Sequence, residues 1–143
     1  MLKVVFDANI IISALCYPES LPAKVFKLAR KRQVLNCISD DILAEIQRNL
    51  VKKFAWQEQD AYRAQRWLLS FSELITPGKQ IKALEYLPDN RILECAVAGG
   101  VQAIVTGNML EYLVSSMPDF GSYHRQALLS NDIIFLCKPS KEI

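Results

Sequence analysis

Short apolar runs that alternate with helical patterns are the feature that most constrains the fold of this chain. The strand-like runs cover residues 2–6, 34–38, 73–76, 101–105 and 133–137. Helical patterns occupy residues 20–29, 39–54, 57–70, 88–98 and 109–116, while residues 10–15 fit either a strand or a helix. Such alternation favours a parallel sheet with helices on both faces and right-handed crossovers. We therefore predict an α/β fold with a central, mainly parallel sheet of about five strands.

Length and composition indicate one ordered domain. The 143 residues, 51% of them hydrophobic, match one ordinary domain with a buried core, so we predict a single unit over residues 1–143. A net charge of +2 is too small to indicate a nucleic-acid partner by itself. The four cysteines are widely spaced, which argues against a zinc site or a redox pair. The chain begins on a strand-like run and contains no long apolar segment, so we expect a cytoplasmic location.

Polar residues follow three of the predicted strands. Asp7 follows the first strand, Ser39 the second, and residues 106–108 the run at 101–105. In open parallel sheets, ligands bind outside the carboxyl ends of the strands. These positions are therefore the first candidates for a functional site.

Three acidic residues are the candidate catalytic groups, although each has an ordinary structural alternative. Asp7 could be a turn residue that accepts hydrogen bonds from nearby backbone N–H groups. Glu45, on a predicted helix, could be a solvated surface acid. Asp89 follows Leu87-Pro88 and could simply cap the next helix.

Taken together, the polar motifs resemble a known family. The segments that carry the likeness are VVFDANIIISAL at 4–15, ISDDILAEIQRNL at 38–50, PDNRILECAVAGGVQAIVTGN at 88–108 and IIFLCKPSKEI at 133–143. This order of motifs resembles the PIN domain, and within it the VapC-like ribonucleases, the toxin components of toxin–antitoxin systems. The resemblance implies a PIN-like three-layer sandwich that hydrolyses RNA phosphodiester bonds.

The resemblance also implies a set of metal ligands. The family's metal-binding acids match Asp7, Glu45 and Asp89, and a fourth acid is replaced here by Asn108. The implied cofactor is Mg²⁺ or Mn²⁺, both of which prefer oxygen ligands. We expect Asp7 to bridge the cations, and Asn108 to weaken one metal site without removing it.

Supporting roles follow for three further residues. Asn9 would orient Asp7, although a simple turn residue is equally consistent. Thr106 would position a water or a phosphate oxygen by hydrogen bonding. Glu94, five residues after Asp89, either adds negative charge to the site or is a solvated helix residue.

Partners are also implied. Lys24, Lys27 and Lys31 fall on one face of a predicted helix, where they would bind RNA phosphates or simply face solvent. The resemblance to toxins implies a small antitoxin protein and a homodimer.

Two other functions stay open at this point. The strand-end Asp7, with residues 104–107 and 136–139, looks like parts of a phosphorelay receiver, a signalling module. A receiver, however, needs adjacent acids after its first strand and a phosphoacceptor Asp after its third. The second alternative is a catalytically weak PIN module that binds RNA or protein.

Overall fold

The computed structural model describes residues 1–78, 87–106, 124–128 and 134–137. Side chains are described for residues 1–78 and 90–106. The described residues form six strands and five helices, which in chain order are β1 (Lys3–Phe6), α1 (Ala8–Cys16), α2 (Leu21–Arg30), β2 (Leu35–Ser39), α3 (Asp40–Phe54), α4 (Glu58–Ser70), β3 (Ser72–Ile75), α5 (Leu87–Gly99), β4 (Ala103–Thr106), β5 (His124–Leu128) and β6 (Ile134–Cys137).

The strands form one sheet in the order β3-β2-β1-β4-β6-β5. Strands β3, β2, β1 and β4 are parallel, whereas β6 pairs antiparallel with both β4 and β5. Because β1, β2 and β4 run the same way, the residues that follow them, beginning with Asp7, share one edge of the sheet.

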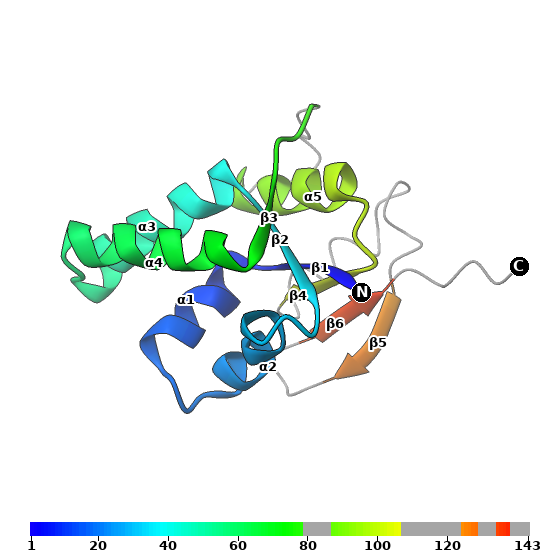
Figure 1. Ribbon diagram of the computed structural model, residues 1–143, viewed down its shortest axis with the longest axis horizontal. Coiled ribbons are helices and arrows are strands. Elements are labelled where there is room, and N and C mark those ends of the chain that lie inside the picture. The colour runs from blue at the N-terminus through cyan, green and yellow to red at the C-terminus, as the bar shows by residue number, and fades with distance from the viewer. Residues whose placement is uncertain (79–86, 107–123, 129–133, 138–143) are drawn as a thin grey trace, which may run out of the picture.

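Helices cover the sheet from two sides. In Figure 1, α5 lies above the strands while α1 and α2 lie below them. Helices α3 and α4 run side by side at the left of that view, beyond the end of β1. Helix α3 contacts both α1 and α5, so it closes the molecule at the carboxyl ends of the parallel strands.

Buried apolar residues hold these layers together. Val4, Val5 and Phe6 of β1 are buried under helices on either side, as expected for a central parallel strand. The Phe6 ring meets the edge of Phe26 from α2, with centroids 5.0 Å apart. On α5, Ile92 and Leu93 are buried against the same sheet.

Local signals explain where the helices begin and end. Ser20 and Ser39 cap α2 and α3, each accepting a hydrogen bond at 3.3 Å from a backbone N–H in the first turn. Helix α1 ends at Cys16, because the next residue, Tyr17, precedes Pro18 and is disfavoured in helical backbone. Helix α5 ends at Gly99, and the next residue, Gly100, has a φ of +60°, which glycine adopts without strain.

The structure confirms the α/β class and corrects several details. The sheet has six strands among the described residues, where about five were predicted, because β5 went unrecognised. Its sequence, HRQAL, has no β-branched residue or alternating pattern, and its pairing with β6 makes it a strand. The ambiguous run 10–15 is helical, within α1. The helix predicted at 109–116 lies outside the described residues.

The topology does not fit the receiver alternative. Receiver domains have the flavodoxin-like order 2-1-3-4-5 of parallel strands. Here β6 lies between β4 and β5 and runs antiparallel to both.

Of the helices in the described residues, none combines the length and the apolar character needed to cross a bilayer.

Candidate active site

The carboxylate of Asp7 is fixed where β1 passes into α1. Its backbone N–H donates to the carbonyl oxygen of Val105 at 2.9 Å, which ties the end of β1 to β4. Its Oδ1 accepts from the backbone N–H of Asn9 at 3.1 Å, so Asp7 caps α1. Its Oδ2 accepts from the hydroxyl of Thr106 at 3.0 Å. With 9% of its surface exposed, Asp7 is held at both oxygens in a nearly dry position.

Glu45 approaches Asp7 from α3. Its side chain is 13% exposed, so it is not a solvated surface acid. Its Oε1 accepts from the amide of Asn49 at 3.0 Å, and its Oε2 pairs with Arg48. Both partners lie one helical turn further along α3, where side chains at i+3 and i+4 meet.

The two carboxylates interact electrostatically. Burial raises the pKa of Asp7 above its usual range, and the negative charge of Glu45 raises it further. The hydrogen bonds from Asn9 and Thr106 act in the opposite direction by favouring the ionised form. Two neighbouring carboxylates with little solvent require a compensating cation or proton, and a hard divalent ion matches their oxygen atoms.

Helix α5 brings a third acid and an arginine to the neighbouring region. Glu94 is only 4% exposed and forms an ion pair with Arg91. The alternative of a solvated helix residue is therefore wrong for Glu94. Asn90 is fully buried next to Arg91 in sequence. The backbone of Asp89 lies in the first turn of α5, but its side chain is outside the described part of the chain.

A pocket of about 320 Å³ opens between α3 and α5, beside these acids. Its lining comes from the start of α1, from α3 and from α5, and comprises Ala8, Asp41, Ile42, Ala44, Glu45, Arg48, Arg91 and Ile92. Ala8 directly follows Asp7 in the chain, and Glu45, whose charge acts on Asp7, lines the pocket itself.

The structure thus brings together part of the predicted site. Asp7, Thr106 and Glu45 share the edge at the carboxyl ends of β1 and β4. Asn108 lies outside the described residues. Within the side chains that are described, no three His, Cys, Asp or Glu residues form a group able to hold a metal ion. The full ligand set therefore remains a prediction.

Two supporting residues both donate hydrogen bonds to Asp7. Thr106 donates its hydrogen bond to Asp7 itself, so it positions the carboxylate. Asn9 contributes its backbone N–H, while its side chain is exposed.

The sequence analysis did not identify Arg48, Asn49 and Arg91 as part of the site. Their spacing of three or four residues from Glu45 and Glu94 was the available signal.

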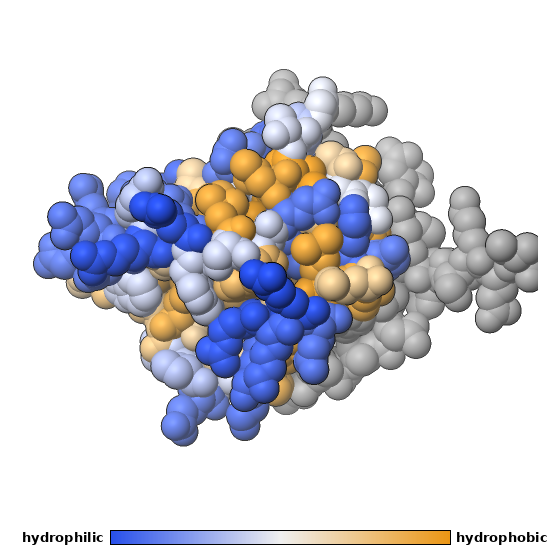
Figure 2. All heavy atoms as spheres, viewed as in Figure 1, coloured by the Kyte–Doolittle hydropathy of each residue, from blue (hydrophilic) through white to orange (hydrophobic). Residues whose placement is uncertain are grey.

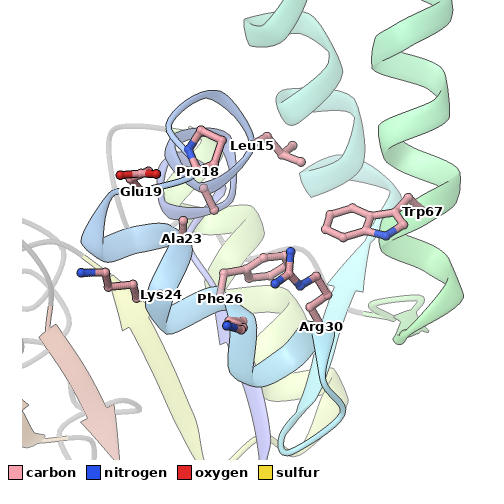
Figure 3. Close-up of a pocket in the computed structure, with 10 residues that line it drawn as sticks. Leu15, Pro18, Glu19, Ala23, Lys24, Phe26, Arg30 and Trp67 are labelled. Carbon is pink, nitrogen blue, oxygen red and sulfur yellow. The ribbon is translucent and has the colours of Figure 1, made fainter.

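The predicted basic face lies on α2. Lys24 and Lys27 are exposed and line a separate pocket of about 360 Å³ with Arg30, whereas Lys31 is exposed at the end of the helix. Figure 2 shows strongly hydrophilic side chains gathered over this region. In Figure 3, Trp67 approaches that pocket from α4, while Lys24, Phe26 and Arg30 lie along α2. Exposure suits both RNA binding and a solvated face, so the RNA role stays a prediction.

Comparisons with known proteins agree with the family that the sequence resembles. A family model described as "PIN domain" matches residues 3–110. The uncharacterized protein MJ1680 of Methanocaldococcus jannaschii is 28% identical over 111 residues, which cover 75% of this chain and 71% of that protein. Among solved structures, the chain is similar to VapBC2 from Rickettsia felis, solved bound to a DNA fragment from their promoter. The TM-score is 0.59 at 18% identity, over 83% of this chain and 96% of the other.

Proposed function

Because this chain belongs to the PIN-domain family, we propose that it is a divalent-metal-dependent endoribonuclease. Family membership supports the broader role of nuclease, and hence of hydrolase. The observation that carries the proposal is the pair of carboxylates at the strand ends. Asp7 is buried and held by Thr106, and it lies close enough to Glu45 for their charges to interact.

The oxygen donors present fit Mg²⁺ or Mn²⁺. Asp7 and Glu45 would hold the cation together with Asp89 and Asn108, the two positions that complete the ligand set in the resembling family. A divalent ion bound there would lower the pKa of an attacking water and stabilise the leaving 3′-oxygen. Cleavage by this chemistry leaves a 5′-phosphate and a 3′-hydroxyl.

The chain's own residues would prepare this site before RNA arrives. Thr106 and the N–H of Asn9 hold the Asp7 carboxylate in a single orientation, which reduces the reorganisation needed for ligand binding. Asn49 and Arg48 do the same for Glu45. The low exposure of both acids limits competition from solvent.

We further propose that the protein is the toxin of a toxin–antitoxin pair. The fold is similar to that in the structure of VapBC2, and the resemblance of the sequence to VapC-like toxins suggests a small antitoxin as partner. Homodimerisation is part of the same proposal, as is action on RNA in the cytoplasm.

Cleavage of a labelled single-stranded RNA tests the enzymatic proposal. We expect products with Mn²⁺ or Mg²⁺ and none with EDTA. Asp7→Asn and Glu45→Gln should each abolish cleavage while the circular dichroism spectrum stays unchanged. Full activity in a folded Asp7→Asn variant would refute the assignment. If the wild type binds RNA without cleaving it at any metal concentration, the chain is the catalytically weak module considered above.

A further inference from the structure

Two arginines from different helices line the pocket beside the acidic pair. Arg48 lies on α3 and Arg91 on α5, and both contribute to the 320 Å³ pocket that also contains Glu45. The side chain of Arg48 is 51% exposed and that of Arg91 is 18% exposed. Each guanidinium is anchored by a glutamate on its own helix, Glu45 for Arg48 and Glu94 for Arg91.

We propose that Arg48 and Arg91 together hold a backbone phosphate of the RNA strand, beside the bond that is cleaved. They are positioning and binding residues that complement the carboxylates. The proposal rests on the proposed ribonuclease function for the identity of the ligand, but the pocket and its arginines stand on the geometry alone.

The charged side chains that line the pocket balance one another. Its lining carries two acids, Asp41 and Glu45, against the two arginines. A carboxylate pair without nearby cations would repel a polyanion, so a nuclease with this acidic edge needs positive groups next to it. The two arginines meet that need beside Glu45, whose charge acts on Asp7.

Guanidinium chemistry explains how an arginine can serve two partners. Each guanidinium has five N–H donors in a fixed plane, and a carboxylate on one side leaves donors for a phosphate on another. The ion pair with glutamate fixes the orientation of the group in advance, which lowers the entropy lost on binding. Because α3 and α5 are packed against each other, one arginine from each helix lines the same pocket.

Binding measured without metal separates this role from catalysis. The probe is a fluorescent six-nucleotide single-stranded RNA in EDTA, followed by anisotropy across a range of salt concentrations. Arg48→Gln should weaken binding about tenfold, the effect typical of removing a charged hydrogen bond. The slope of log affinity against log salt should fall by about 0.7 for each phosphate of the single strand that the variant no longer binds.

Arg91 needs a paired variant because its loss would break the ion pair with the buried Glu94. Arg91→Gln combined with Glu94→Gln keeps the net charge and allows a neutral hydrogen bond. We expect the same weakening as for Arg48→Gln. The matched control is Arg63→Gln on α4, which breaks an exposed i, i+3 ion pair with Asp60 (3.5 Å between Nη1 and Oδ1) outside this pocket. Its affinity and slope should equal those of the wild type.

A second probe tests whether the contact is with a phosphate. The same RNA is made with one neutral methylphosphonate linkage, placed at each position in turn. In the wild type, a neutral linkage at one position should weaken binding strongly, and in Arg48→Gln the effect at that position should be smaller because only Arg91 still contacts the phosphate. If every position stays equally important in the variant, Arg48 does not contact a phosphate.

Three results would overturn the inference. The first is that Arg48→Gln and the Arg91 double variant bind RNA as the Arg63 control does. The second is that a hexaglutamate peptide binds the wild type as tightly as the RNA and is weakened equally by the variants, because the pocket then recognises carboxylates. The third is the methylphosphonate result above.

The outcome is independent of the catalytic proposal. If Asp7→Asn loses Mn²⁺-dependent cleavage while the arginine variants bind RNA normally, the nuclease function stands and the phosphate site is wrong. If the wild type cleaves nothing but the arginines govern RNA affinity, the phosphate site stands and the nuclease function is wrong.

Discussion

Asp7 performs two tasks whose demands conflict. As the cap of α1 it accepts a backbone hydrogen bond, which needs only an oxygen, but as a proposed metal ligand it must keep its charge while buried. Asparagine would retain the cap and remove the charge, because the two residues cap helices equally well. We therefore expect Asp7→Asn to lower activity without lowering stability.

The first prediction concerns the pH dependence of stability without metal. The pKa of Asp7 is raised from 3.8 in the folded chain, so the folded state binds a proton more tightly than the unfolded state. Stability should consequently fall as pH rises from 3.8 through the raised pKa. Asp7→Asn removes this penalty, and we expect it to be more stable than the wild type by roughly 1 kcal/mol at pH 8.

Urea unfolding in EDTA between pH 4 and 8 measures this difference. The advantage of Asp7→Asn should shrink toward pH 4, because more of the wild-type carboxyl binds a proton as the pH falls. Asp7→Ala is the control, since it removes the same charge but also the cap, at a cost of about 1 kcal/mol. Parallel pH curves for wild type and Asp7→Asn would show that the buried charge carries no penalty.

Asn108 is the residue at which the chain departs from the resembling family. We predict that Asn108→Asp tightens Mn²⁺ binding, because a charged oxygen attracts a divalent ion more strongly than an amide oxygen. Activity at limiting metal should rise more than activity at saturation. Without metal, the added carboxylate should lower thermal stability, most clearly at low salt. If metal dependence and apo stability both stay unchanged, Asn108 is not part of the site.

At the scale of elements, α2 presents its lysines on the surface. We predict that replacing Lys24, Lys27 and Lys31 together by glutamine weakens RNA binding and lowers the salt slope by about 0.7 for each phosphate that is no longer bound. Salt-dependent anisotropy measures both quantities. The comparison is the double variant Lys52→Gln, Lys53→Gln at the exposed end of α3. It removes two positive charges of the same kind from another helix. An unchanged slope would identify the three lysines as a solvated face.

At the scale of the whole molecule, two buried cysteine thiols report on the packing of α5 against the sheet. Cys37 on β2 and Cys95 on α5 are buried, and burial raises their pKa values to about 11 and about 12. The thiolate is the reactive form, so both should resist thiol reagents at pH 8 in the native state. We predict that they react only at the rate of global unfolding.

A Cys16→Ser, Cys137→Ser variant isolates these two thiols for that measurement. Labelling in increasing urea should follow the unfolding transition seen by circular dichroism. Rapid labelling of Cys95 without urea would mean that α5 leaves the sheet in a local opening.

The sequence determined those features that depend on neighbours along the chain. The serine caps of α2 and α3 place polar oxygens beside free backbone N–H groups, and the apolar run before Asp7 is recognisable as a buried strand. The order of acidic motifs along the chain was enough to indicate the family. Such features are local, so residue type and spacing suffice to predict them.

The tertiary structure decided what depends on contacts between distant residues. Thr106 and Asp7 are separated by 99 positions, and they meet because β1 and β4 are parallel neighbours. Strand β5 exists because β6 supplies its hydrogen bonds, since its own composition favours no strand. Glu45 and Glu94 read as surface residues of amphipathic helices, yet the packing of α3 and α5 buries both. The free energies of strand pairing and of side-chain burial depend on contacts between two or more segments. They therefore cannot be predicted from the sequence of one segment alone.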